Sequence, residues 1–326
     1  MKWFLGILGV LAAALLVAFL VFRVPDTDPE AMRAKYGGEP SQFVEIGDGV
    51  TVHLRDEGPR DAPAIILLHG SAADLHTWQP WVDALKDRYR VIRFDQVGHG
   101  LTGPDPADDY SLENFVADID EVADALELES FVLGGNSMGG GHSVAYALAH
   151  PDRVSALVLV DAGGVPENVR SSDDEDSGGN IGFTLARTPV VNRIMNYITP
   201  RSMIEQSLRQ TVSNEDIVTE DAVDRYWELL RYPGNRNATR IRFSGEWTSF
   251  DEAQVSSITA PTLVIWGEED GLIPVEAGLW YDRHLPNSRL VVYPGIGHLP
   301  QEEVADQSVA YLANWLDEQE LAEPSR

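Results

Sequence analysis

A serine lies among glycines at residues 134–141, where the sequence reads GGNSMGGG. Gly135, Ser137 and Gly139 fit the pattern G-x-S-x-G, which places a serine on a sharp turn between a buried strand and a helix. An apolar run precedes the pattern and helix-forming residues follow it. Glycines suit such a turn because a Cβ atom there would collide with the neighbouring strand or helix. The spacing predicts that Ser137 is a nucleophile, beside helix amides that favour a developing negative charge.

A serine hydroxyl needs a base before it can attack, and two later segments supply the residues. Asp270 follows the apolar run 262–266, and His298 follows the apolar run 289–293. We expect both side chains in loops directly after strands, at the same edge of a parallel sheet as Ser137. The chain order serine, aspartate, histidine predicts that His298 accepts the serine proton. Asp270 would orient the imidazole and stabilise its charged form.

The charge that forms on an attacked carbonyl oxygen requires backbone amide donors. We expect these at Met138, just after the nucleophile, and at Ser71, in the loop after the first long apolar run. Trp78 and Trp81 follow the same loop, and Trp227 lies much later in a helical segment. These three tryptophans are candidate pocket residues, although aromatic residues at helical spacing are also typical of a core.

The elements that must position these residues alternate along the chain. A hairpin is predicted over 42–55, and continuous apolar strands then alternate with amphipathic helices, which is the pattern of a parallel sheet covered on both faces. The predicted strands are 64–68, 91–94, 131–133, 156–160, 262–266 and 289–293, and the predicted helices lie near 77–88, 111–127, 138–149, 275–284 and 303–317. The fold class is therefore α/β.

The alternation of strands and helices stops between residues 164 and 245, where helix-like segments replace it. An insertion that leaves a strand at its carboxyl end would cover the edge at which open α/β sheets bind ligands. We therefore expect a core of residues 42–163 and 246–320, with a helical cap at 164–245.

Six motifs carry a family resemblance: LLHGSAADLHTW, FDQVGHGLT, GGNSMGGG, AHPDRV, WGEEDGLIP and GIGHLP. In this order they resemble the α/β-hydrolase family with a helical cap, over roughly 42–320. The resemblance implies the α/β-hydrolase fold and a Ser-His-Asp hydrolase. Epoxide hydrolases and haloalkane dehalogenases of the family use an aspartate nucleophile, and Ser137 argues against both. The block GNSMGG is similar to that of hydrolases acting on carbon–carbon bonds of ring-cleavage products, which commonly carry an aromatic residue where this chain has Leu299.

Composition excludes several classes of protein. The chain of 326 residues carries 24 basic and 52 acidic residues, a net charge of -28, which repels nucleic acid. It contains no cysteine, so disulfides, thiolate metal sites and cysteine nucleophiles are excluded. Its eight histidines show no pair at metal-ligand spacing. We expect no metal, no cofactor and no nucleic-acid partner.

The first segment differs from the rest. Residues 3–22 read WFLGILGVLAAALLVAFLVF, and about 20 consecutive apolar residues are enough to span a bilayer as a helix. The run ends without a small-residue cleavage site, which favours an uncleaved anchor at 1–22. Residues 23–41 then predict a tether. We expect a membrane protein with a single N-terminal anchor and an extracytoplasmic catalytic domain.

The leading hypothesis is a serine hydrolase that acts on small-molecule carboxylic esters through an acyl-enzyme intermediate. One alternative is a carbon–carbon bond or lactone hydrolase that uses the same residues. Another, from a different class, is a ligand-binding protein that keeps the fold without turnover. The sequence leaves the oligomeric state open.

Overall fold

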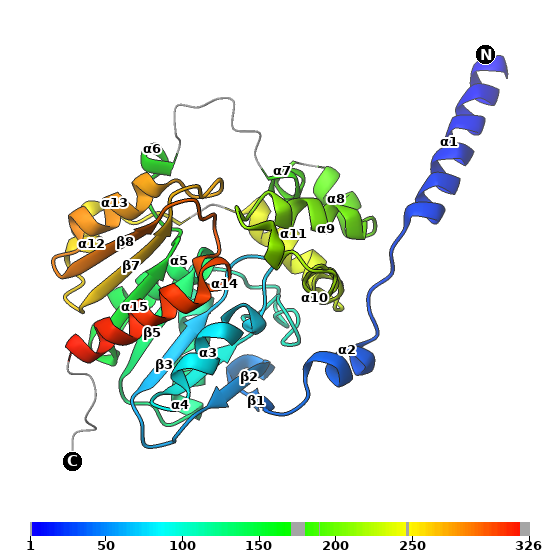
Figure 1. Cartoon of the computed structure of the whole chain (residues 1–326). Coiled ribbons are helices and arrows are strands. Elements are labelled where there is room, and N and C mark those ends of the chain that lie inside the picture. Colours follow the sequence, from blue (N-terminus) through cyan, green and yellow to red (C-terminus); the bar gives the residue numbers. More distant parts are fainter. Residues whose placement is uncertain (1, 171–179, 189, 246–247, 320–326) are drawn as a thin grey trace.

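A single eight-stranded sheet organises the chain in the order β1-β2-β4-β3-β5-β6-β7-β8 (Figure 1). The computed structural model describes residues 2–170, 180–188, 190–245 and 248–319. The antiparallel pairs are β1 with β2 and β2 with β4, and all other neighbours are parallel. The strands are β1 (Ser41–Glu45), β2 (Thr51–Glu57), β3 (Ala64–Leu68), β4 (Arg90–Phe94), β5 (Phe131–Asn136), β6 (Val154–Val160), β7 (Thr262–Gly267) and β8 (Ser288–Tyr293).

Successive side chains of each strand point to opposite sides of the sheet. Both sides are buried, each in an apolar cluster of its own. On β3, Ile66 and Leu68 join one apolar cluster, while Ile65 and Leu67 join the other. Helices α3 (Gln79–Leu85) and α15 (Ala305–Glu318) pack on the face of Ile65. The opposite face carries α4 (Leu112–Ala125), α5 (Met138–Ala149), α12 (Glu252–Ser256) and α13 (Val275–His284). The short helix α14 (Pro300–Glu303) leads into α15.

The helix predicted from residue 111 shows how local signals set an element. The Ser111 hydroxyl accepts a hydrogen bond from the Asn114 N–H at 3.3 Å and caps α4. Phe115, Ile119 and Val122 then lie on the buried stripe. The predicted fold class, a mostly parallel sheet with helices on both faces, is confirmed.

Short helices form a second layer over the carboxyl ends of the parallel strands (Figure 1). They lie between β6 and β7 in the chain, in the region of the predicted cap. These helices are α7 (Ile181–Arg187), α8 (Val191–Met195), α9 (Arg201–Arg209), α10 (Glu220–Leu230) and α11 (Asn235–Ser244), whereas the short α6 (Glu167–Arg170) lies beside α13. Helices α9 and α10 share a small apolar cluster of their own, which includes Ile204, Leu208 and Val223.

The segment between α1 (Lys2–Phe22) and β1 lies against these cap helices. Its helix α2 (Pro29–Tyr36) begins after Asp28, whose side chain accepts a hydrogen bond from Ala31 N–H at 2.8 Å. In the last turn of α2, the Lys35 ammonium and the Tyr36 hydroxyl both donate to Glu228 of α10, at 2.7 and 2.6 Å. The region predicted as a tether is thus hydrogen-bonded to the cap.

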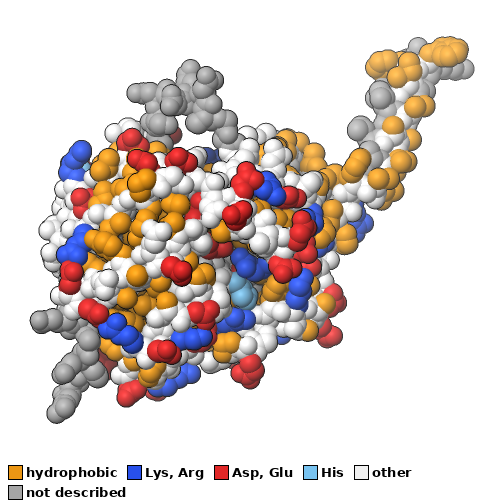
Figure 2. Space-filling view, in the orientation of Figure 1, with side chains coloured by type: hydrophobic (Ala, Val, Ile, Leu, Met, Phe, Trp, Pro, Cys, Tyr) orange, Lys and Arg blue, Asp and Glu red, His pale blue; other side chains and the backbone are white. Residues whose placement is uncertain are grey.

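Helix α1 projects away from the body of the molecule, and its described apolar side chains are exposed (Figures 1 and 2). A membrane span requires about 20 consecutive, mostly apolar residues in one helix. Over the residues that the structure describes, no helix meets this requirement of length and apolar character. This finding contradicts the membrane anchor predicted at 1–22. The predicted extracytoplasmic placement of the catalytic domain depended on that anchor and is withdrawn.

Candidate active site

Ser137 lies at the turn between β5 and α5 with a φ of 55°, a left-handed backbone conformation that is uncommon outside glycine. Three hydrogen bonds hold the turn: Ser137 N–H donates to Val160 O at 3.0 Å, and the N–H groups of Gly141 and Gly163 donate to Ser137 O at 3.1 and 2.8 Å. The surrounding structure thereby fixes the strained serine in place.

The glycines of the turn allow backbones to approach closely. A Cβ atom on Gly135 would lie 2.3 Å from the carbonyl of Gly139, and one on Gly139 would lie 2.4 Å from Leu68 O. Both contacts are with backbone atoms, which cannot rotate away. The pattern G-x-S-x-G thus lets α5 start directly against β5 and β3, at the place predicted from the sequence.

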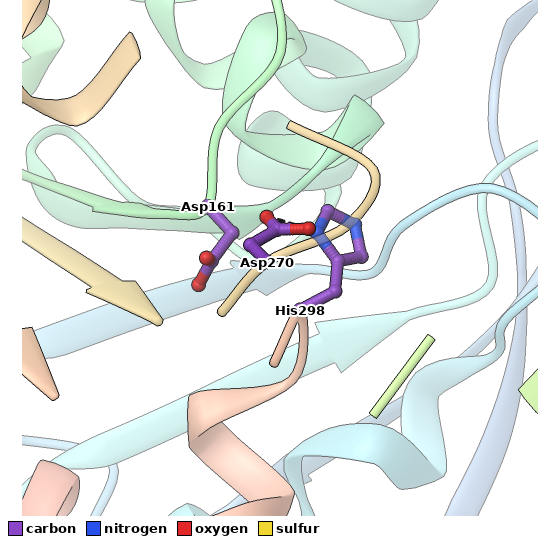
Figure 3. A group of neighbouring side chains, drawn as sticks. All are labelled: Asp161, Asp270 and His298. Carbon is purple, nitrogen blue, oxygen red and sulfur yellow. Dashed lines mark hydrogen bonds and ion pairs between the residues drawn. The ribbon is translucent and has the colours of Figure 1, made fainter. Parts of the chain in front are cut away.

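His298 and Asp270 meet at the carboxyl end of the sheet, as the loops after β8 and β7 predict (Figure 3). His298 Nδ1 lies 2.6 Å from Asp270 Oδ2, and both residues are buried. The other oxygen of Asp270 accepts hydrogen bonds from the N–H groups of Leu272 and Ile273, at 2.8 and 3.1 Å. These bonds aim the carboxylate at the imidazole. Asn136 fixes the histidine backbone, because its side-chain amide donates to His298 O at 3.1 Å.

Ser137 and His298 line the same small cavity of about 70 Å³, which also contacts Ser71 and Leu299. Within the described residues, no hydrogen bond joins the Ser137 hydroxyl to the imidazole. Such bonds between a nucleophile and its base are often long before substrate binds. The structure therefore brings Ser137 and His298 to one cavity, and Asp270 is bonded to the histidine.

A much larger cavity of about 920 Å³ opens on the other side of Ser137. It lies between the sheet and the cap, and its apolar lining includes four aromatic side chains, Phe115, Phe183, Phe243 and Phe250. Ser71 and Met138, the predicted amide donors, line it together with Ser137. Their side chains touch, since the Ser71 hydroxyl donates to Met138 Sδ at 3.5 Å. The described backbone hydrogen bonds include none donated by the Ser71 or Met138 N–H.

Buried imidazoles surround the loop that carries Ser71. His69 and His99 contact edge to face, with ring centroids 5.0 Å apart, and His142 Nδ1 donates to Gln96 Oε1 at 2.6 Å. Burial lowers the pKa of His69, and burial followed by the charge of Arg242 lowers the pKa values of His99 and His142 well below the ordinary value. These imidazoles are therefore neutral and shape the loop.

Asp161 is a buried carboxyl beside the His298–Asp270 pair that the sequence reasoning missed (Figure 3). It follows β6 directly, and its Oδ1 accepts a hydrogen bond from Gly267 N–H at 3.0 Å. Burial, together with the charge of Asp270, raises the pKa of Asp161 well above its ordinary value. Its position in the sequence could have identified it, because an acid directly after a central parallel strand lies at the same edge of the sheet as Ser137.

Asp161, Asp270 and His298 are also the one group among the described residues whose ligand atoms, within 4.8 Å of one another, could hold a metal ion. The chemistry of the group argues otherwise. His298 Nδ1 and one Asp270 oxygen already bond each other, and Asp161 favours its protonated form. The donor set therefore fits proton transfer better than metal binding.

The three predicted pocket tryptophans lie elsewhere. Trp78 and Trp81 are fully buried in the apolar cluster between the sheet and α15. Trp227 packs in the cap, where its indole N–H donates to Thr199 O at 2.8 Å and the Arg231 guanidinium lies 3.6 Å from its ring. None of the three lines either described cavity.

Comparison with known proteins agrees with this architecture. Residues 63–305 match the family described as alpha/beta hydrolase fold. A 2-hydroxy-6-oxononadienedioate/2-hydroxy-6-oxononatrienedioate hydrolase of Paraburkholderia xenovorans is 31% identical over 282 residues, covering 82% of this chain and 92% of that protein.

Two solved structures share the fold at lower identity. A meta-cleavage product hydrolase from Pseudomonas fluorescens has a TM-score of 0.71 at 24% identity, covering 85% of this chain and 98% of that one. A membrane phospholipase A, described as a bacterial virulence factor, has a TM-score of 0.73 at 24% identity, covering 98% of this chain and 99% of that one. With the family match over most of its length and a hydrolase relative above 30% identity, this chain belongs to the α/β-hydrolase family and is an enzyme of that family.

Proposed function

We propose that the chain is a serine hydrolase that cleaves carboxylic esters through Ser137, His298 and Asp270. The observation that carries this proposal is the 2.6 Å bond between His298 Nδ1 and Asp270 Oδ2, in a cavity shared with Ser137. A bond at Nδ1 leaves Nε2 as the atom that can accept a proton from the serine.

In the first half of the reaction, His298 Nε2 removes the proton from the Ser137 hydroxyl while the oxygen attacks the ester carbonyl carbon. The carbonyl oxygen becomes an anion and accepts hydrogen bonds from the N–H groups of Ser71 and Met138. Asp270 stabilises the imidazolium. The Leu272 and Ile273 N–H groups donate to its other oxygen and hold the carboxylate against the imidazole.

The imidazolium then gives its proton to the departing alkoxide, the bond between carbon and the leaving oxygen breaks, and an alcohol leaves. Ser137 now carries the acyl group as an ester. A water molecule repeats the attack with His298 as base, the bond to Ser137 Oγ breaks, and the serine recovers its proton as the carboxylic acid leaves. Every proton comes from the substrates or from His298, so the proposed reaction needs no cofactor.

The larger cavity supports a substrate with an apolar acyl group. Its volume of about 920 Å³ lies within the range of small-molecule sites, and its lining includes four phenylalanine rings. Small to medium acyl chains would bury their methylene groups against these rings. Each buried methylene contributes about 0.8 kcal/mol to binding.

A second candidate function is hydrolysis of a carbon–carbon bond, which the name of the Paraburkholderia xenovorans relative favours. The same three residues would act, with a ketone in place of the ester. Leu299, beside His298, packs in the apolar cluster of the cap helices α9 and α10. It takes the place of the aromatic residue that such hydrolases commonly carry at this position, and we therefore rank the ester first. Lactone hydrolysis is chemically an ester cleavage and belongs to the first candidate.

The test is a substrate panel on the full-length chain and on the Ser137→Ala variant. Wild type should hydrolyse p-nitrophenyl esters of graded chain length faster than a vinylogous diketone, and Ser137→Ala should lose roughly a thousandfold or more of kcat. Ser257→Ala, at an exposed serine outside both cavities, should keep wild-type activity.

Two outcomes would contradict the proposal. Undiminished ester hydrolysis by Ser137→Ala would remove the serine from the mechanism. A wild-type protein that neither turns over any substrate of the panel nor becomes labelled by a fluorophosphonate probe would be a ligand-binding member of the family.

A further inference from the structure

Two guanidinium groups, those of Arg187 and Arg242, line the larger cavity, and that of Arg242 is bonded to the loop that carries Ser71. Arg242 of α11 lines this cavity together with Ser137 and Ser71. Its Nη2 donates to the Ser71 hydroxyl at 2.6 Å, and its Nη1 donates to His99 Nε2 at 2.7 Å. The group is thus held by two hydrogen bonds at the place where an ester must approach the nucleophile.

Both partners of Arg242 are neutral. His99 accepts at Nε2, so its proton lies on Nδ1, which faces Val97 O at 3.1 Å. Burial and the charge of Arg242 keep the pKa of His99 well below its ordinary value. The Ser71 hydroxyl donates onward to Met138 Sδ. Neither bond brings a negative charge to the guanidinium.

Among the described residues, Arg242 forms no ion pair. The acids at the rim of the cavity, Asp108 and Asp109, are directed elsewhere: Asp108 Oδ1 faces the Tyr110 hydroxyl and Asp109 Oδ1 accepts from Ser111 N–H. Burial lowers the pKa of Arg242 to about 10, so it stays charged at neutral pH. A partly buried cation without a counter-charge carries a desolvation cost, and a bound anion would offset that cost.

We infer that Arg242 is a specificity-determining residue that binds an oxyanionic group, a carboxylate or a phosphate, on the ester substrate. This inference rests on the proposed ester hydrolysis at Ser137. Two of the five N–H donors of the guanidinium are used in the bonds to Ser71 and His99, and the remaining donors can pair with anionic oxygens. In a chain of net charge -28, long-range forces repel anionic substrates, so attraction must come from a local cation.

The test compares three ethyl esters of similar length on the full-length chain: neutral ethyl hexanoate, monoethyl adipate, and the ethyl ester of a phosphonopentanoic acid. Wild type should show a higher kcat/KM for one or both anionic esters than for ethyl hexanoate. In Arg242→Gln the ratio of anionic to neutral kcat/KM should fall about tenfold or more. The ester that loses more identifies the carboxylate or the phosphate as the group bound.

Two further variants make the comparison specific. Arg240 lies two residues before Arg242 on the same helix and bonds Asn237 outside both cavities, so Arg240→Gln should keep the wild-type ratio. Arg242→Lys keeps the positive charge without the planar fork, and it should retain part of the preference. An unchanged ratio in a folded Arg242→Gln protein, or an equal fall in Arg240→Gln, would overturn the inference.

A binding measurement separates this inference from the proposed function. Calorimetry should detect adipate or the phosphonate product bound to Ser137→Ala, and this affinity should fall about tenfold or more in Ser137→Ala/Arg242→Gln. Arg242-dependent binding by a chain that hydrolyses no ester would contradict the ester function and keep the anion site. Ester hydrolysis together with anion binding that does not depend on Arg242 would contradict the anion site at Arg242 and keep the ester function.

Discussion

Asp161 is a second carboxyl at the point where the structure holds Asp270 against His298. Its Oδ2 is buried with no hydrogen-bond partner among the described residues, and its pKa is raised by burial and then by Asp270. A neutral Asp161 avoids placing a second anion beside Asp270. It also accepts the hydrogen bond of Gly267 N–H at 3.0 Å, which helps to hold the start of the loop that carries Asp270. We therefore regard Asp161 as a positioning residue.

Replacement of Asp161 by asparagine should preserve activity, because the amide has the shape of the protonated carboxyl. Asp161→Ala leaves the Gly267 amide unpaired and should lower the free energy of unfolding by about 1–3 kcal/mol and reduce kcat. Steady-state kinetics and denaturant unfolding at neutral pH measure both effects. If Asp161→Asn lost activity as severely as Ser137→Ala, the carboxyl would have to ionise during the reaction.

The pH dependence of the free energy of unfolding tests independently whether Asp161 is protonated in the folded chain. The ordinary pKa of Asp161 is 3.8 and its folded pKa lies well above that value, so the folded chain keeps a proton that the unfolded chain loses. The contribution of Asp161 to stability is therefore complete below 3.8 and is lost as pH rises through the folded pKa. Asp161→Asn should remove this loss and gain stability relative to wild type as pH rises. An identical slope in both proteins would contradict the raised pKa.

At the scale of elements, α2 is held to the cap by apolar packing of Met32 against Leu229 and by one acid, Glu228. The Lys35 and Tyr36 side chains share Glu228 Oε2, and the Thr27 hydroxyl donates to the Glu228 carbonyl at 3.3 Å. Burial, then the hydrogen bond to Glu228, raises the pKa of Tyr36, so the phenol stays protonated and donates. Glu228 thereby fastens α2 to α10 across 192 residues of sequence.

Removal of this acid should loosen α2 without unfolding the core. Glu228→Ala should lower the protection of the amides of α2 by about 1–3 kcal/mol in hydrogen exchange, because a buried hydroxyl loses its acceptor. Glu215→Ala on the same cap breaks an exposed ion pair with Arg209 and should change protection by less than about 1 kcal/mol. Equal effects of the two substitutions would show that Glu228 is an ordinary surface acid.

Elements with strong local signals could be predicted from the sequence. The helices predicted at 138–149 and 275–284 match α5 and α13, since a glycine turn starts one and Pro274 precedes the other. Local signals for α2 were also present, with Asp28 as cap and Pro29 at the first helical position, but composition suggested a tether. The cap helices span only 5 to 11 residues each, so their bounds needed tertiary contacts.

At the scale of the whole molecule, the predicted site residues divide by how they are placed. Ser137, Asp270 and His298 follow strands, and strand order alone brings such positions to one edge. Arg242 reaches Ser71 across 171 residues of sequence and from another layer, so no local pattern could reveal it. Trp78 and Trp81 lie in the core and not in the pocket. Their helical spacing was visible in the sequence, but it does not say which layer the helix faces.

Acidification should destabilise the whole molecule through its buried imidazoles. The folded pKa values of His99 and His142 lie well below 6.5, chiefly because of burial, so their contribution to stability is complete above 6.5 and is lost as pH falls through the folded values. Each pKa unit corresponds to about 1.4 kcal/mol. We expect Tm to fall between about pH 7.5 and pH 5. His142→Gln, which removes one such group, should start from a lower Tm because the ring stacks on Phe115, yet lose less on acidification. A Tm that is level over this range in wild type, or an equal loss in both proteins, would mean that these imidazoles accept protons without unfolding.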